Sequence, residues 1–278
     1  MSFDSRITPA RGDLVASSLR GKVDAKNFVD GTVQTIGVGR TALRAGPSPT
    51  SGMASEMLFG ESLTVYERRD GWAWVQSGID EYVGYVREEG LGEAFAPTHR
   101  VIATSTPLLP APDVKRPTLD LLPMNARVQV TGHEGKFARI STRGFVFADH
   151  LVPLDGRQKD WVAFAERFVG VPYVWGGKTY AGLDCSGLVQ TALQAAGVPC
   201  PRDSDMQEKT LGQVVEDLSR PERGDLVFWK GHVGIMLDGA RMIHANAHFM
   251  NVTVERLSEA ITRIAKSGSE VTSVKRVQ

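Results

Sequence analysis

The sequence predicts an α+β protein whose N-terminal half is built from short antiparallel strands and whose C-terminal half places helices before a meandering sheet. Two observations carry this prediction. Between residues 31 and 153, short apolar alternations are broken by Gly and Asp, and their order repeats after about 65 residues. After Leu154 the apolar spacing changes from two residues to about 3.6, the period of a helix, before strand-like runs return.

Composition and charge exclude several classes of partner. The 278 residues carry 32 Lys and Arg against 32 Asp and Glu, so no general attraction to nucleic acid or to anionic lipid is expected. The first residues are charged throughout and lack the apolar core of a signal peptide, and no run is long enough to span a membrane. We therefore expect a cytoplasmic protein with no nucleic-acid or membrane partner, and we take a monomer as the working expectation.

The β-rich half contains an internal repeat. The segment ARVQVTGHEGKFARIS follows the pattern of ESLTVYERRDGWAWVQS, and RGFVFADHLV then follows YVGYVREEGL. This repeat predicts two copies of one small β-barrel, at residues 31–97 and 98–154, after a polar and partly helical lead-in over residues 1–30. The Pro-rich residues 106–117 are expected to form a loop, because Pro cannot donate to a sheet ladder.

Residues 155–278 are expected to form one domain. Helical spacing predicts a helix from Trp161 to Phe168 and a longer one that begins at Cys185, with Asp184 as its N-cap and Gly197 at its end. Strands are predicted over residues 225–229, 232–236, 240–245 and 251–256, with the tight-turn pairs Lys230-Gly231 and Asp238-Gly239 between the first three.

Cys185 is the candidate nucleophile. At the start of a helix, a thiolate is stabilised by the positive end of the helix dipole, and the unpaired backbone N–H groups there can hold an oxyanion. Position alone favours a buried small hydrophobic residue, because Cys185 lies on the apolar face of its helix and free Cys is commonly buried. A histidine near Cys185 would favour the nucleophile over the structural role.

Two histidines supply that partner. His232 opens one predicted strand, and His244 lies in the next strand, across the hairpin closed at Asp238-Gly239. Residues whose numbers sum to about 477 face each other in such a hairpin, so the two imidazoles are expected to be neighbours. One ring then acts as the base and the second fixes its orientation. The alternatives are an ordinary polar sheet end or a metal site.

Metal binding and a disulfide are the competing uses of these residue types. His244 and His248 have the spacing of a zinc-ligand pair, but they run from a strand into a turn rather than along a helix. A disulfide between Cys185 and Cys200 is allowed by sequence and would be unusual in the cytosol. We expect no metal and no organic cofactor.

Three segments carry a resemblance to a known family, namely FVGVPYVWGGKTYAGLDCSGLVQ, RGDLVFWKGHVGIMLDG and MIHA. They strongly resemble the NlpC/P60 family of cell-wall cysteine peptidases, and the match covers residues 155–278. The resemblance implies a papain-like domain with Cys185, His232 and His244 as its catalytic triad. It also implies that Tyr173 stands near the nucleophile and helps to stabilise the oxyanion, although a packed aromatic is the alternative.

The two β-barrels are similar to bacterial SH3 domains, and the whole order is similar to that of γ-D-glutamyl-L-diamino-acid endopeptidases. This resemblance implies hydrolysis of the γ-D-glutamyl–diamino acid bond in a murein tri- or tetrapeptide, with a preference for a free N-terminal L-alanine, during recycling of wall peptides. It does not separate diaminopimelate from lysine. The alternatives are a protein that only binds wall peptides, and amidase or acyl-transfer chemistry on the same fold.

A preference for a free amine needs a carboxylate in a closed pocket, because an ammonium is best held there. Asp184, directly before the nucleophile, is the first candidate, and its alternative role is that of helix N-cap. The other substrate-binding candidates implied by the resemblance are Ser186, Trp175, Asp203 and Ser204, together with Glu56 and Tyr85 from the first SH3 domain, for which Glu61 and Tyr82 are the alternatives.

Overall fold

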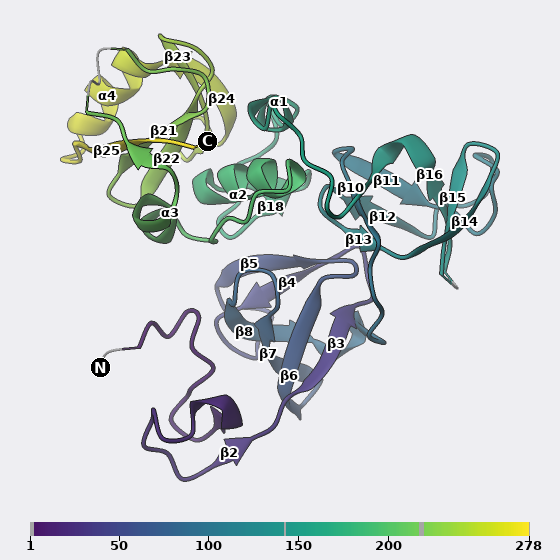
Figure 1. Cartoon of the computed structure of the whole chain (residues 1–278). Coiled ribbons are helices and arrows are strands. Elements are labelled where there is room, and N and C mark those ends of the chain that lie inside the picture. The colour runs from purple at the N-terminus through teal and green to yellow at the C-terminus, as the bar shows by residue number, and fades with distance from the viewer. Residues whose placement is uncertain (1–2, 142, 217–219, 278) are drawn as a thin grey trace. The chain divides into compact units, whose positions relative to one another are not determined.

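A computed structural model describes residues 3–141, 143–216 and 220–277, and the chain divides into two units, Met1–Leu154 and Asp155–Gln278. Unit 1 is made almost entirely of strands, and all four α-helices described lie in unit 2 (Figure 1). This division agrees with the change of apolar period after Leu154 that the sequence displays.

The first part of unit 1 is a seven-stranded antiparallel sheet in the order β5-β4-β8-β7-β6-β3-β9. Its strands are β3 (Thr32–Ile36), β4 (Arg40–Arg44), β5 (Met53–Leu58), β6 (Ser62–Arg69), β7 (Trp72–Ser77), β8 (Val83–Arg87) and β9 (Leu91–Gly92). The β6–β7 hairpin closes through Asp70 and Gly71, both at positive φ, as its turn sequence predicts. Alternate residues of these strands, such as Leu63, Val65 and Val75, enclose one apolar core.

The second part of unit 1 repeats this order in smaller sheets. Its strands are β10 (His99–Val101), β11 (Ser105–Leu108), β12 (Asp120–Pro123), β13 (Arg127–Val128), β14 (Val130–Glu134), β15 (Phe137–Ile140), β16 (Gly144–Phe147) and β17 (Leu151–Pro153). A 3-10 turn follows the hairpin region in both copies, η2 (Glu88–Gly90) between β8 and β9 and η3 (Ala148–His150) between β16 and β17. A separate apolar cluster that includes Val101, Leu122 and Val146 forms the second core.

Two expectations for unit 1 are wrong in part. The lead-in contains no α-helix among residues 3–30, only η1 (Ser17–Leu19) and a two-stranded parallel pair of β1 (Val15–Ala16) and β2 (Phe28–Val29). The expected loop at 106–117 begins inside β11, where Pro107 pairs with Leu121. Pro107 is tolerated because β11 belongs to a two-stranded sheet and so has an open edge that needs no donor.

Unit 2 is a six-stranded antiparallel sheet with helices, in the order β20-β25-β21-β22-β23-β24. The strands are β20 (Gln213–Val214), β21 (Asp225–Trp229), β22 (His232–Met236), β23 (Arg241–Asn246), β24 (Asn251–Arg256) and β25 (Val271–Arg276). A two-stranded pair, β18 (Lys178–Thr179) and β19 (Gly182–Leu183), precedes them. The helices are α1 (Val162–Glu166), α2 (Cys185–Ala195), α3 (Ser204–Thr210) and α4 (Leu257–Ala265).

The predicted helix at Cys185 and the four predicted strands are confirmed within a residue at their ends. The first helix is shorter than expected, but Trp161, Phe164 and Phe168 are buried as its spacing predicts. Helices α3 and α4 and the strand β25 were not predicted. Their signals are short, although Leu257, Ile261 and Ile264 of α4 do fall at helical spacing and pack against the sheet.

The sheet of unit 2 is buried on both faces, which fixes where its strands can present polar side chains. Leu226 and Phe228 of β21 are buried on one face, while Val227 and Trp229 are buried on the other with residues of α4. Helix α2 packs against β22 and β23. A polar side chain on these strands is therefore either paired or placed at a strand end. His232 is the first residue of β22, while His244 is buried within β23.

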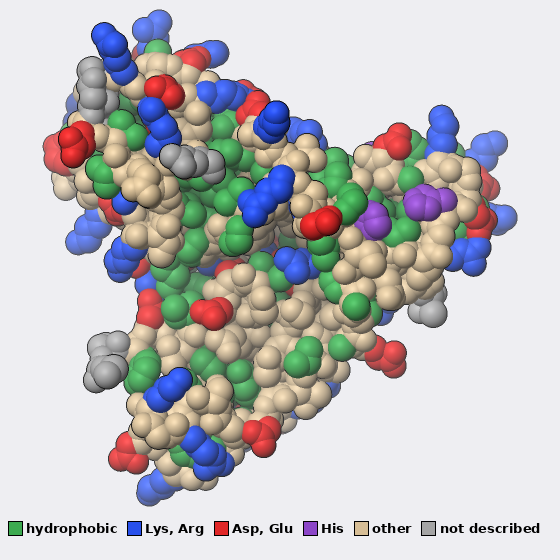
Figure 2. Space-filling model, in the orientation of Figure 1, with side chains coloured by type: hydrophobic (Ala, Val, Ile, Leu, Met, Phe, Trp, Pro, Cys, Tyr) green, Lys and Arg blue, Asp and Glu red, His purple; other side chains and the backbone are tan. Residues whose placement is uncertain are grey.

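Surface charge follows the balanced composition. On the face drawn in Figure 2, Lys and Arg side chains are interspersed with Asp and Glu on both units, rather than gathered into one patch of a single sign. Over the described ranges of the chain, no helix is long and apolar enough to cross a membrane.

Gly60 is a position at which the fold of unit 1 demands glycine. Its φ is +72°, and a Cβ there would lie 2.0 Å from the Arg127 carbonyl oxygen, where Arg127 donates its N–H to Phe59. We expect Gly60→Ala to lower the free energy of unfolding by about 2–4 kcal/mol through strain and overpacking. Gly132→Ala, with no heavy atom within 4 Å, should change it by less than about 0.5 kcal/mol. Urea unfolding followed by Trp fluorescence tests this, and equal losses in both variants would contradict it.

Candidate active site

Cys185 is the first residue of α2, and the local sequence explains why the helix starts there. Asp184 has extended backbone angles and its side chain accepts a hydrogen bond from the Gly187 N–H at 2.7 Å. This is the N-cap arrangement that the sequence predicts. The nucleophile candidate is almost fully buried, with an exposed fraction of 8%. Its sulfur lies against the backbone N–H groups of Ser186 and Val233, the latter next to His232 in β22.

Burial controls the charge of this thiol. It raises the pKa of Cys185 to about 12, helped by the charge of Asp184 and opposed by the Val233 and Ser186 N–H groups and by Arg202. The sequence argument expected the helix terminus to favour the thiolate. The pKa of Cys185 shifts in the opposite direction, because the loss of solvation outweighs the N–H groups. The resting residue is a neutral thiol at pH 7.

The two histidines lie together, as their positions across the hairpin predict. Nε2 of His232 is 2.8 Å from Nδ1 of His244, and the ring centroids are 5.1 Å apart. The strand register differs from the expectation by one, since Ile235 pairs with Ile243. Both imidazoles nevertheless reach the same end of the hairpin, because neighbours that are offset along adjacent strands remain within reach of long side chains.

A buried carboxylate lies behind the histidines. Glu255 of β24 approaches Nε2 of His244 to 2.7 Å. Burial, the charge of His244 and that of Arg263 together lower the pKa of His232 to about 3, and Glu255 acts in the other direction. His232 is therefore a neutral imidazole at pH 7. Glu255 was missed by the sequence analysis.

Tyr173 stands in the segment that leads to the nucleophile. Its backbone N–H donates to the Met250 carbonyl at 2.9 Å, and it forms a bridge with Leu183. Burial, with the charges of Cys185 and Asp184, raises the pKa of Tyr173 to about 12. The phenol therefore keeps its proton at neutral pH and is able to donate a hydrogen bond. Tyr173 is half-buried.

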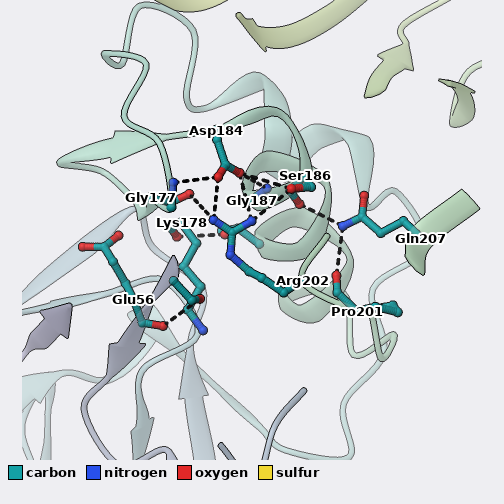
Figure 3. A network of polar contacts seen from close by, with 12 residues as sticks. Glu56, Gly177, Lys178, Asp184, Ser186, Gly187, Pro201, Arg202 and Gln207 are labelled. Carbon is teal, nitrogen blue, oxygen red and sulfur yellow. Dashed lines mark hydrogen bonds and ion pairs between the residues drawn. The ribbon is translucent and has the colours of Figure 1, made fainter. Parts of the chain in front are cut away.

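Asp184 does more than cap the helix. Its two carboxylate oxygens accept from the Arg202 guanidinium at 2.9 and 2.7 Å, and one of them also accepts from the Gly176 N–H at 2.8 Å. Arg202 also donates to the Ser186 hydroxyl at 3.0 Å. Figure 3 shows Arg202 lying between Asp184, Ser186 and the carbonyl of Gly177. The carboxylate proposed for a substrate ammonium is thus already bound by a cation within its own unit.

The remaining candidates of unit 2 lie nearer the surface. Trp175 has an exposed fraction of 71%, which leaves its indole accessible. Asp203 directly precedes α3 and Ser204 begins it, and both are half-buried. No side-chain hydrogen bond from Asp203 caps that helix, so its carboxylate does not have the N-cap role that Asp184 has.

The four candidates of unit 1 are held by contacts within that unit. Glu56 is buried and accepts from Arg40 at 2.8 Å, while Glu61 accepts from the Leu58 N–H at 2.9 Å. Tyr82 belongs to the first apolar core, and the Tyr85 hydroxyl accepts from Arg11 at 3.0 Å. Glu61 and Tyr82 thus have clear structural roles. The part of Glu56 and Tyr85 in a substrate pocket stays a prediction.

The structure also bears on the two alternative roles for these cysteines and histidines, a disulfide and a metal site. Cys185 and Cys200 are not joined in a disulfide. His248 is exposed and packs edge-on against Phe249, whereas His244 is buried. Across residues 3–141, 143–216 and 220–277, no group of three or more His, Cys, Asp or Glu side chains is placed to hold a metal ion.

The Asp184–Arg202 ion pair should be costly to break, because both side chains are buried, with exposed fractions of 8% and 1%. We expect Arg202→Met to lower the free energy of unfolding by about 3–5 kcal/mol, since it leaves a buried carboxylate without its cation. The double variant Asp184→Asn/Arg202→Met should recover part of that loss. Arg256→Met at an exposed site is the matched control. Thermal unfolding checks this, and a loss for Arg202→Met no larger than the control's would contradict it.

Comparisons with known proteins agree with this geometry. The NlpC/P60 family model matches residues 170–266, and the bacterial dipeptidyl-peptidase Sh3 domain model matches residues 43–91. The second predicted SH3 domain, at 98–154, lies outside that match and stays a prediction. The matched catalytic region includes Cys185, His232 and His244.

Two curated relatives extend over most of the chain. A γ-D-glutamyl-L-lysine dipeptidyl-peptidase of Bacillus subtilis (strain 168) is 27% identical over 237 residues, covering 74% of this chain and 77% of the relative. One of the same name from Bacillus cereus is 25% identical, covering 69% of this chain and 67% of the relative. The crystal structure of an NlpC/P60 family protein from Bacillus cereus covers 88% of this chain and 99% of that one, with a TM-score of 0.76 at 18% identity.

At that identity the solved structure supports the fold, and the family models add the identity of the domains. The chain therefore contains an NlpC/P60 domain and carries a bacterial SH3 domain ahead of it.

Proposed function

We propose that this protein is a cysteine endopeptidase that hydrolyses the bond between the γ-carboxyl of D-glutamate and the following diamino acid in murein peptides. The observation that carries the proposal is the placement of Cys185 at the start of α2, against the backbone beside His232, whose ring is bound by His244. The two relatives that share most of the chain are named for the γ-D-glutamyl-L-lysine bond.

The first step is attack by the Cys185 sulfur on the γ-carbonyl carbon. Because Cys185 and His232 are both neutral at rest, the thiol proton passes to His232 as the S–C bond forms. Nε2 of His232 is engaged by His244, so Nδ1 is the nitrogen that receives the proton. The Cys185 N–H and the protonated Tyr173 phenol are our proposed donors to the oxyanion.

The second half of the reaction returns the site to its resting state. The imidazolium of His232 gives its proton to the leaving nitrogen as the C–N bond breaks, which releases the diamino acid as a free amine. Water then attacks the thioester with His232 as the base, and the products are the γ-carboxylate of D-glutamate and the free thiol. One water is consumed, and no other reactant is needed.

A free N-terminal L-alanine is our proposed specificity determinant. An ammonium needs a carboxylate, and Asp184 is bound by Arg202. We assign Asp203, which directly precedes α3 and is half-buried, as a carboxylate of unit 2 that contacts the amine. Peptides of this kind are small fragments rather than intact wall, which supports a role in recycling wall peptides in the cytoplasm.

Loss of the nucleophile or of the base should abolish hydrolysis. We expect Cys185→Ala and His232→Ala to lower kcat for L-Ala-γ-D-Glu-diaminopimelate at least about a thousandfold, because each removes a group that takes part in bond formation or proton transfer. Cys200→Ala, which removes the other buried thiol, is the matched control and should keep activity. Turnover is measured by mass spectrometry of the products, and turnover retained in either catalytic variant would sink the proposal.

The free-amine preference has its own test. We expect Asp203→Asn to raise KM for the peptide with a free amine about tenfold, as the loss of one charge-assisted contact predicts. The same variant should leave KM for the N-acetylated peptide unchanged. Asp205→Asn, which alters an exposed carboxylate on the same helix, is the control. An equal effect on both peptides would rule out Asp203 as the reader of the amine.

A further inference from the structure

Glu255 is a buried carboxylate that the proposed reaction does not use. Its side chain has an exposed fraction of 8%, and it lies between His244 on β23 and Arg263 on α4. Burial alone would raise the pKa of Glu255, but the contacts with His244 and Arg263 outweigh it and hold that pKa below its usual value. A carboxylate kept charged in the interior, next to the group that orients a base, has a chemical consequence.

The contacts of Glu255 set the protons of both imidazoles. The carboxylate 2.7 Å from Nε2 of His244 favours a proton on that nitrogen, and Nδ1 of a ring that carries this one proton is an acceptor. His232 must then donate from Nε2 to Nδ1 of His244, across the 2.8 Å contact. Nδ1 of His232 is left without a proton, and this is the form that a base for the Cys185 thiol needs.

We propose that Glu255 is a positioning residue that acts through His244 to hold His232 in its basic tautomer and to stabilise the imidazolium that forms, and that Arg263 limits this effect. This inference rests on the proposed function only in naming His232 as the base. It adds two residues to the Cys185–His232–His244 arrangement, the buried carboxylate of Glu255 and the positive charge of Arg263 on α4.

The charges around His232 predict whether removal of each neighbouring group weakens or strengthens the thiolate–imidazolium pair. The titratable or charged groups that act electrostatically on His232 are His244 from β23, Glu255 from β24 and Arg263 from α4. The negative charge of Glu255 favours protonated His232, and the positive charge of Arg263 disfavours it. Removal of Glu255 should therefore weaken the thiolate–imidazolium pair, and removal of Arg263 should strengthen it. If Glu255 and Arg263 had only structural roles, removing them would not change the thiolate–imidazolium pair in opposite directions.

Alkylation of Cys185 by iodoacetamide tests this without any substrate, because the thiolate is the reacting form. At a fixed pH of about 8, we expect Glu255→Gln to slow the alkylation of Cys185 and Arg263→Met to speed it, each by about tenfold, which corresponds to about one unit of pKa. Peptide mass spectrometry separates Cys185 from Cys200. Glu259→Gln, which removes an exposed carboxylate of α4, is the control and should match the wild type.

Hydrolysis provides the second readout. Glu255→Gln should lower kcat about tenfold or more with little change in KM, the usual scale for a group that orients a reacting residue. Opposite alkylation shifts would uphold the inference even in a protein that hydrolyses no murein peptide, in which case only the proposed function fails. Alkylation rates that fall together or stay constant in both variants, with folding intact by circular dichroism, would overturn the inference and leave the proposed function standing.

Discussion

The ion pair between Asp184 and Arg202 is the interaction on which the site depends. It joins the turn at Gly176, the first residues of α2 and the segment before α3, and both partners are buried. A carboxylate in that position would oppose a thiolate at Cys185, and the guanidinium compensates for it. The pair therefore builds the helix start that presents the nucleophile and neutralises the charge that would otherwise hinder it.

Burial also determines the charge states of the proposed nucleophile and base before the reaction. The thiol of Cys185 and the imidazole of His232 are both neutral at rest, because the interior disfavours either charge. In the proposed reaction, charge separation then accompanies attack, when an oxyanion and an imidazolium form together. The donors at the helix start and the carboxylate behind His244 are placed where those two charges would develop, so the site favours the state in which both are present.

The sequence predicts the backbone of this site well because its signals are local. The apolar period through Cys185, the N-cap at Asp184 and the hairpin around Asp238-Gly239 each depend on a few neighbouring residues, and all are found in the structure. The tertiary partners were out of reach. Arg202 and Glu255 carry no local pattern that distinguishes a buried ion from a solvated one, and their roles follow only from which strands and helices pack together.

The lost solvation of Cys185 was missed for the same reason. A helix terminus is visible in the sequence, but the burial that overrides it is not. In unit 1, the turn and strand order were predictable from the repeat, whereas the partners of Glu56 and Glu61 were not. Local patterns thus predict the backbone around the proposed reacting groups, whereas packing determines the partners and the charge states of their side chains.

The central claim is that Cys185 forms a covalent thioester with the γ-carbonyl of D-glutamate. Intact-mass spectrometry after rapid acid quench of the protein with L-Ala-γ-D-Glu-diaminopimelate measures this directly. The account predicts a transient mass increase equal to the L-Ala-γ-D-Glu acyl group, located on the peptide that contains Cys185. Product formation with no adduct on Cys185, or with the adduct on another residue, would contradict it.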